Sequence, residues 1–128
     1  MKIEHIALWT SDLERMREFY QGYFDMKCGK KYENLQKGFS SYFLSFDNGA
    51  RLEIMNRNDI PTHVGTRGLC HGFTHFAISV GSKEAVDRLT ERLKNDGVSI
   101  VGEPRTTGDG YYESVILDPE GNHVEITE

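Results

Sequence analysis

The chain has 128 residues, the length of one compact domain, so we expect a single domain over 1–128. Hydrophobic residues make up 38% of the sequence, enough for a core that needs neither a disulfide nor a metal to fold. The 15 Lys and Arg residues and 20 Asp and Glu residues give a net charge of −5 without a basic block. This balance excludes nucleic acid as an expected partner, because phosphate contacts dominate that kind of binding.

The sequence predicts no contact with a membrane. Its apolar runs are far shorter than the ~18 residues of a membrane span, and its first residues carry no apolar secretory stretch. The two cysteines, Cys28 and Cys70, form no Cys-x-x-Cys pattern and fit a reducing compartment. A cytoplasmic location is therefore the default expectation.

The first predicted element is a strand over 3–10, whose alternation puts His5, Ala7 and Trp9 on one face. A helix should follow from about 13 to 26, since Ser11 and Glu14 form a capping-box pattern before a stripe of apolar residues at helical spacing. Three short strands at about 26–33, 41–47 and 50–56 complete the first half.

The second half repeats this order after a connector over 57–72 that contains Pro and several Gly. A strand begins at 73, and a helix begins after Ser82 and stops at Asn95-Asp96-Gly97. Strands at about 98–103, 111–117 and 122–127 follow.

The two halves also match residue by residue at their first and last strands. Ile3-Glu4-His5-Ile6-Ala7-Leu8 corresponds to Phe73-Thr74-His75-Phe76-Ala77-Ile78, and residues 44–54 correspond to 116–126. We therefore expect one duplicated βαβββ unit, over about 1–56 and 73–128. The predicted fold class is α+β, with the two units forming a curved mixed sheet cup and the helices packed outside it.

The repeat places an imidazole on the first strand and a carboxylate on the last strand of each half. By strand parity, Glu53 and Glu125 lie on the face opposite the apolar residues that pack under the helix, together with His5 and His75. If the halves assemble about a pseudo-twofold axis, the four side chains can converge. Two neutral imidazoles and two carboxylates can bind a divalent cation, and this donor set suits zinc, nickel, cobalt, iron or manganese.

At these residues the sequence resembles the vicinal oxygen chelate superfamily, which includes glyoxalase I, extradiol dioxygenases, fosfomycin-modifying enzymes and bleomycin-resistance proteins. The resemblance is carried by His5-Ile6-Ala7, His75-Phe76-Ala77 and the segment Asp118-Pro119-Glu120-Gly121-Asn122-His123-Val124-Glu125-Ile126. It covers nearly the whole chain and is most similar in pattern to short bacterial glyoxalase I-like proteins. Similarity to glyoxalase I implies a homodimer with sites that draw ligands from two chains, and it implies four metal ligands: His5, Glu53, His75 and Glu125.

The resemblance implies a metal-dependent lyase that acts on a small oxygen-chelating substrate, such as the hemithioacetal of a 2-oxoaldehyde. A glutamate would move a proton between adjacent carbons of this substrate. Glu125 is the first choice of catalytic base and Glu53 the second, although the symmetry of the repeat does not separate them.

The substrate residues depart from the family pattern. Short bacterial glyoxalase I enzymes carry an Arg for the glutathione carboxylate about where this chain has Trp9, so glutathione is not the expected thiol. Arg51 and His123 lie two residues before the matched glutamates and are the candidates to meet an anionic group instead.

Three alternatives remain open. The chain can be a metal-free protein that sequesters a drug, as bleomycin-resistance proteins do, and its net charge and Trp9 are compatible with this function. It can also transfer a thiol to an antibiotic epoxide, although that branch uses two His and one Glu and leaves Glu53 without a role. A different zinc cluster could form from Cys70, His71 and His75.

Overall fold

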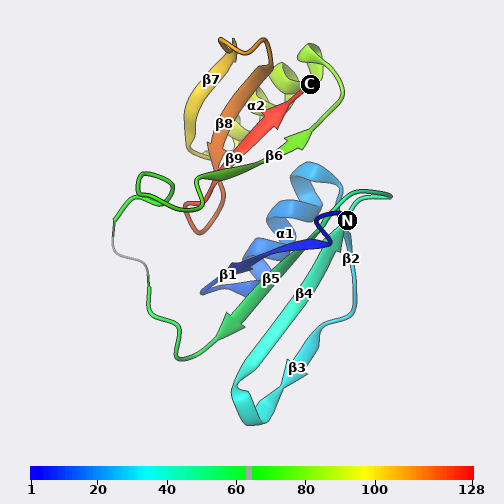
Figure 1. Ribbon diagram of the computed structural model, residues 1–128, viewed down its shortest axis with the longest axis vertical. Helices are drawn as coiled ribbons and strands as arrows, with labels where there is room; N and C mark the ends of the chain where they lie inside the picture. The colour runs from blue at the N-terminus through cyan, green and yellow to red at the C-terminus, as the bar shows by residue number, and fades with distance from the viewer. Residues whose placement is uncertain (63–64) are drawn as a thin grey trace. The chain divides into compact units, whose positions relative to one another are not determined.

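The computed structural model describes residues 1–62 and 65–128, which form two compact units on either side of positions 63–64 (Figure 1). The predicted connector over 57–72 includes those two positions, which lie outside the described residues. Unit 1 contains β1 (His5–Trp9), α1 (Leu13–Phe24), β2 (Lys27–Cys28), β3 (Tyr32–Asn34), the 3₁₀ turn η1 (Leu35–Lys37), β4 (Phe39–Ser45) and β5 (Arg51–Arg57). Unit 2 contains β6 (His75–Ser79), α2 (Lys83–Asn95), β7 (Ile100–Thr106), β8 (Tyr112–Leu117) and β9 (His123–Thr127).

Each unit is built on one mixed sheet. The strand order is β1-β5-β4-β2 in unit 1, with β3 also paired to β4, and β6-β9-β8-β7 in unit 2. In both sheets the first strand pairs in parallel with the last strand, and the other neighbours are antiparallel. The predicted α+β class and the βαβββ order are therefore confirmed, with the second strand of unit 1 divided into β2 and β3.

The strand registers of the two sheets are equivalent around the two glutamates that were predicted as metal ligands. Ala7 lies opposite Glu53 in unit 1, and Ala77 lies opposite Glu125 in unit 2. The histidine two residues before each alanine therefore has the same relation to the glutamate of its own unit. The correspondence expected from the repeat is confirmed at these strands.

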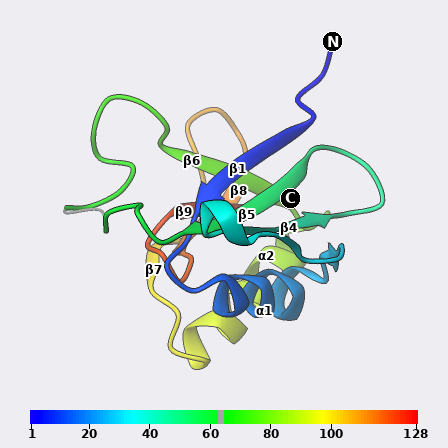
Figure 2. The ribbon, with the colours of Figure 1, turned by 90° about the horizontal axis from the view of Figure 1, so that it is seen from below.

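The helix of each unit covers one face of its sheet. Figure 2 shows α1 running along one side of the strands of unit 1, where it packs on β4 and β5. The buried apolar residues of this layer are Leu13, Met16, Phe19, Tyr20, Phe24, Leu44, Leu52 and Ile54. Burying a side chain of this size contributes about 1.5–3 kcal/mol, so this packing outweighs the low helix propensity of Gly22 in α1.

In unit 2, α2 packs on β7, β8 and β9 through a smaller core that includes one polar pair. The hydroxyls of Thr90 and Ser114 lie 2.6 Å apart, and the Thr90 hydroxyl also donates to the carbonyl of Val86. This contact shows that Ser114 faces the helix. Its neighbours Glu113 and Val115 therefore face the opposite side of the sheet.

The ends of the helices follow the predicted chemistry with one correction. Ser82 caps α2 by accepting from the backbone N–H of Ala85, as expected. The cap of α1 is Asp12 and not Ser11, because the carboxylate of Asp12 accepts from the backbone N–H of Arg15 at 3.0 Å. The predicted end at 26 is also wrong, since α1 ends at Phe24 and Asp25 takes the left-handed conformation. Neither described helix is long and apolar enough to cross a membrane.

Candidate metal centre

Unit 2 brings His75 and Glu125 together on the face of its sheet that points away from α2. Val124 and Ile126 are fully buried on the helix side, so the strand directs Glu125 to the opposite side. The Nε2 atom of His75 lies 3.2 Å from Oε1 of Glu125. Burial raises the pKa of the Glu125 carboxyl and the charge of Glu113 adds to this, while His75 and Arg105 act against it.

Unit 1 contains the equivalent pair, His5 and Glu53, with Nε2 and Oε2 3.9 Å apart. The other ring nitrogen of His5, Nδ1, lies 2.5 Å from a carboxylate oxygen of Glu4. With the proton on Nδ1 and donated to Glu4, the Nε2 lone pair is directed to the side of Glu53. Metal-binding histidines commonly have such a carboxylate partner on the second nitrogen.

Both pairs have the donor chemistry of a divalent metal site. Two ligand atoms bound to one ion at ~2.0–2.2 Å lie roughly 3–3.5 Å apart when their bonds are close to tetrahedral or octahedral angles. The separation of 3.2 Å in unit 2 fits this geometry, and the 3.9 Å separation in unit 1 needs a small rotation of the Glu53 carboxylate. Over residues 1–62 and 65–128 no three or more His, Cys, Asp or Glu gather as a metal cluster, so each unit supplies two candidate ligands.

The three predicted substrate residues have different surroundings. Trp9 packs edge-on against Phe39, with ring centroids 6.2 Å apart, and the Arg57 guanidinium lies 5.3 Å from the Trp9 ring. Arg51 forms an ion pair with Glu4, and its guanidinium stacks over Phe43. Trp9 and Arg51 thus share one sheet face with Glu53, as strand parity predicted.

His123, the third, lies against the loop that precedes β6. A Cβ atom at Gly68 would lie 2.7 Å from Nδ1 of His123 and 2.7 Å from the carbonyl oxygen of Thr74. Gly68 also has a φ of +76°, a conformation that favours glycine. The close approach of this loop to His123 therefore depends on the absence of a side chain at position 68.

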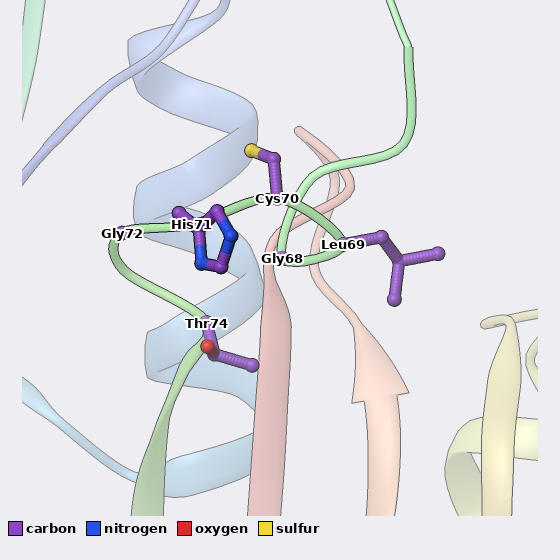
Figure 3. Close-up of a pocket in the computed structure, with 6 residues that line it drawn as sticks. All are labelled: Gly68, Leu69, Cys70, His71, Gly72 and Thr74. Carbon is purple, nitrogen blue, oxygen red and sulfur yellow. The ribbon is translucent and has the colours of Figure 1, made fainter.

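The same loop surrounds an open hollow of about 490 Å³ (Figure 3). Its lining residues are Gly68, Leu69, Cys70, His71, Gly72 and Thr74. Cys70 and His71 are both exposed in this loop. The zinc cluster considered for Cys70, His71 and His75 is absent from the described residues, which contain no such group of three.

Two charged residues that were not predicted from the sequence lie on the face of unit 2 that carries Glu125. Arg105 on β7 lies opposite Glu113 on β8, and their side chains meet at 3.4 Å. The alternation of β8 could have placed Glu113. The face of Arg105 could not be read in this way, because the register of β7 shifts on both sides of Gly102.

Two βαβββ units, each with a His and a Glu on the sheet face that points away from its helix (the open face), place the chain in the class of proteins with a duplicated βαβββ fold. The profile of the Glyoxalase/Bleomycin resistance protein/Dioxygenase superfamily matches residues 2–126, and the chain belongs to this superfamily.

Relatives within the superfamily include enzymes and a protein of unknown activity. The chain is 29% identical over 127 residues to lactoylglutathione lyase GLX1 of Arabidopsis thaliana, covering 95% of this chain and 42% of the plant protein. It is 30% identical to the uncharacterized protein YqjT of Bacillus subtilis, covering 97% and 96% of the two chains. The crystal structure of glyoxalase I from Zea mays superposes with a TM-score of 0.80 at 26% identity, covering 98% of this chain and 44% of that one. The chain thus spans less than half the length of its plant relatives.

Proposed function

We propose that the chain is a metal-dependent lyase of the glyoxalase I type. Its substrate would be a small molecule with two neighbouring oxygens, such as the hemithioacetal of a 2-oxoaldehyde. The observation that carries this proposal is the His–Glu pair that recurs at equivalent positions of the two units. The proposed ligands of a zinc, nickel, cobalt, iron or manganese ion are His5, Glu53, His75 and Glu125.

A divalent ion held by these ligands would polarise the two oxygens of the substrate and acidify its C–H bond. Glu125 would take the proton from the carbon that bears sulfur and return it to the neighbouring carbon, while the hydroxyl proton of the first carbon moves to the oxygen of the second, so that the hemithioacetal becomes a 2-hydroxy thioester without loss of any atom. Glu53 is the second candidate for this base. Family similarity supports Glu125, and its position next to His75 on the open face of unit 2 is compatible with the role.

We further propose that Trp9, Arg51 and His123 contact the substrate. Trp9 and Arg51 share the face of Glu53, and His123 shares the face of Glu125 on the same strand. The charge of Arg51 is matched by Glu4, so Arg51 offers a substrate less net positive charge than an unpaired guanidinium would. A homodimer and a cytoplasmic location remain predictions of the same proposal.

The test is metal analysis of the purified protein followed by a panel of hemithioacetals from several thiols, with each of the five metals added in turn. Because each chain supplies four proposed ligands, we expect about one metal ion per chain. We also expect turnover of at least one hemithioacetal. Glu125→Gln should lower kcat at least 10²-fold, as expected for loss of a general base. Glu91→Gln, an exposed change on the outer helix α2, should leave kcat unchanged.

A drug-sequestering function is the second candidate, and the aromatic surface of unit 1 favours it. Tyr32, Phe39 and Trp9 form a continuous series of ring contacts on the open face of the sheet, where a planar compound could stack. Less than a tenth of a metal per chain after reconstitution, with no turnover of any hemithioacetal, would support this function and contradict the lyase.

A further inference from the structure

Arg105 brings the only permanent positive charge to the sheet of unit 2. Among the residues of β6, β7, β8 and β9 it is the one Arg or Lys. Its partner across the sheet, Glu113, lies opposite Thr127, which has the same parity as Glu125. Arg105, Glu113 and Glu125 therefore lie on one face, away from α2.

The guanidinium of Arg105 is held in place but keeps much of its hydrogen-bonding capacity. Its hydrogen bonds to Glu113 and Glu103 are long: Nη2 lies 3.4 Å from Oε1 of Glu113, and Nη1 lies 3.5 Å from the backbone carbonyl oxygen of Glu103. A guanidinium has five N–H donors in a planar fork. The Arg105 side chain is 49% exposed, whereas that of Glu113 is 11% exposed, so solvent and ligands reach the cation rather than the carboxylate.

Gly102 gives the guanidinium its position. A Cβ atom at residue 102 would lie 2.8 Å from Nη1 of Arg105 and 3.2 Å from Cγ2 of Val115. The side chain of Arg105 thus folds back over the bulge in β7 and occupies the space that any other residue at 102 would fill.

The position of the Arg105 guanidinium over Gly102 sets its approximate distance from Glu125. Gly102 lies opposite Val115, and Val115 lies opposite Glu125, so the three residues form one row across the sheet. Two strand spacings of ~4.8 Å place the ends of this row about 10 Å apart. Such a span fits a compound whose anionic group is separated from its reacting oxygens by a short chain of a few bonds.

We infer that Arg105 anchors a carboxylate of the substrate, so that the chain acts on small anionic compounds such as hemithioacetals of a mercaptocarboxylic acid. This inference rests on the proposed function for the identity of the reacting group. A planar carboxylate matches the guanidinium fork and can accept two parallel hydrogen bonds from it. Glu113 acts as a positioning residue that keeps the fork over Gly102.

The test uses an unreactive pair of probes, 3-(2-oxopropylsulfanyl)propanoate and its methyl ester, which differ in the negative charge and in one methyl group. Binding to the full chain is measured by titration calorimetry, with and without added zinc. We expect the acid to bind at least tenfold more tightly than the ester. Arg105→Gln should remove this preference by weakening the acid about tenfold while the ester is unaffected.

Three further variants separate anchoring from a loss of fold. Arg105→Lys should restore part of the preference, because an ammonium keeps the charge but not the bidentate geometry. Gly102→Ala should weaken the acid alone by displacing the guanidinium, and the exposed Arg88→Gln on α2 is the matched control that should change nothing.

Equal binding of acid and ester to the unmodified chain, or an equal loss of both in Arg105→Gln, would overturn the inference. Because the probes cannot react and are also titrated without metal, an anion preference that depends on Arg105 can be found even if no hemithioacetal is turned over. That result would contradict the proposed lyase and leave the anion site standing. Turnover of a hemithioacetal without any preference for the acid would support the proposed lyase and contradict the anion site at Arg105.

Discussion

Glu4 stands next to the candidate ligand His5 and joins it to Arg51. It accepts from the Nδ1 side of His5 and also pairs with the Arg51 guanidinium, so the carboxylate is held from two sides. This contact orients the imidazole, and an ionised Glu4 favours the tautomer that carries its proton on Nδ1. Loss of such an outer partner commonly reduces metal affinity 10–100-fold.

We therefore expect Glu4→Ala to weaken zinc binding at least tenfold in competition with a chelator of known affinity. The exposed Glu18→Ala on α1 serves as the control, since Glu18 contacts Arg17 and lies on the helix rather than on the open face of the sheet. Unchanged affinity in Glu4→Ala would show that His5 needs no partner or is not a ligand.

Single residues also show where sequence reasoning works. Parity on β1, β5, β6 and β9 was enough to predict that His5 shares a face with Glu53 and His75 with Glu125, because these strands are regular and paired without bulges. The sheet face of Arg105 was not predicted, because strand parity is lost across a bulge. The role of Glu4 was not predicted, because it depends on a contact with the neighbouring side chain and not on the alternation of the strand.

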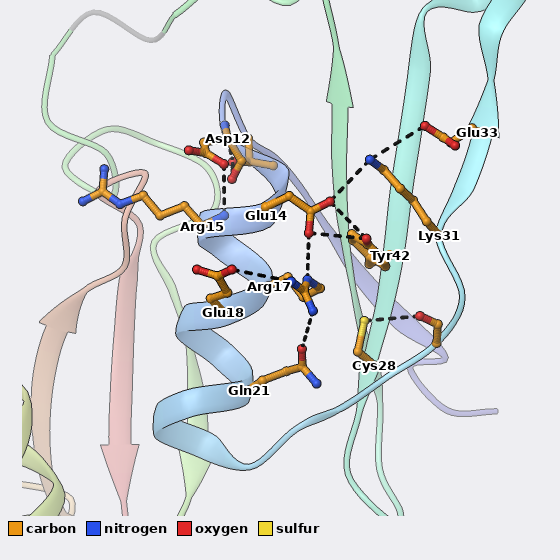
Figure 4. A network of polar contacts seen from close by, with 12 residues as sticks. Asp12, Glu14, Arg15, Arg17, Glu18, Gln21, Cys28, Lys31, Glu33 and Tyr42 are labelled. Carbon is orange, nitrogen blue, oxygen red and sulfur yellow. Dashed lines mark hydrogen bonds and ion pairs between the residues drawn. The ribbon is translucent and has the colours of Figure 1, made fainter.

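At the scale of elements, a polar network joins α1 to β4 and the segment before β3 (Figure 4). Tyr42 donates to Glu14 at 3.0 Å, and Arg17 and Lys31 lie at 2.8 and 3.3 Å from the same carboxylate. Burial alone would raise the pKa of Glu14, but the hydrogen bonds from these three side chains outweigh it and lower the pKa below its ordinary value of 4.5.

A lowered pKa in the folded state means that ionised Glu14 stabilises the fold, and this contribution is complete above pH 4.5 and is lost as the pH falls through the lowered value. We expect Glu14→Gln to reduce the free energy of unfolding at pH 7 by less than about 1 kcal/mol, because the site is half-exposed and screened by solvent. Urea titrations from pH 7 to pH 3 should show the difference shrinking at the acidic end. A difference that stays constant, or one that Glu18→Gln reproduces, would contradict this role of Glu14.

The elements themselves were predictable where one local signal dominated. The apolar stripes of both helices, the Ser82 cap and the turn at Asp118 all act within a few residues, and Asp118 indeed accepts from the backbone N–H groups of Glu120 and Asn122. The α1 cap was mispredicted because Ser11 and Asp12 are both residue types that favour a cap. In the structure Asp12 is the cap, and its own backbone N–H donates to the hydroxyl of Thr10. The division of one expected strand into β2 and β3 depends on pairing with β4, which sequence periodicity does not contain.

At the scale of the whole molecule, the two units are similar in topology but differ in the chemistry of their open faces. Unit 1 offers aromatic rings, from Trp9 to Tyr32, beside its His–Glu pair. Unit 2 carries the Arg105–Glu113 ion pair beside its own His–Glu pair. Duplication thus accounts for the His–Glu pair that each unit carries, and divergence of the surrounding residues accounts for the different side chains beside each pair.

The proposed four-ligand site can be built within one chain or from two chains, and mixing two inactive variants distinguishes these arrangements. His5→Ala damages only unit 1, and His75→Ala damages only unit 2. Family similarity leads us to expect a homodimer in which each site combines unit 1 of one chain with unit 2 of its partner. In a mixed dimer one site then carries both substitutions and the other carries neither.

Unfolding and refolding the variants together should therefore restore tight zinc binding to about one site in four, whereas each variant refolded alone should restore none. No recovery after mixing, with exchange of chains verified by mass spectrometry of the dimers, would mean that each chain completes its own site.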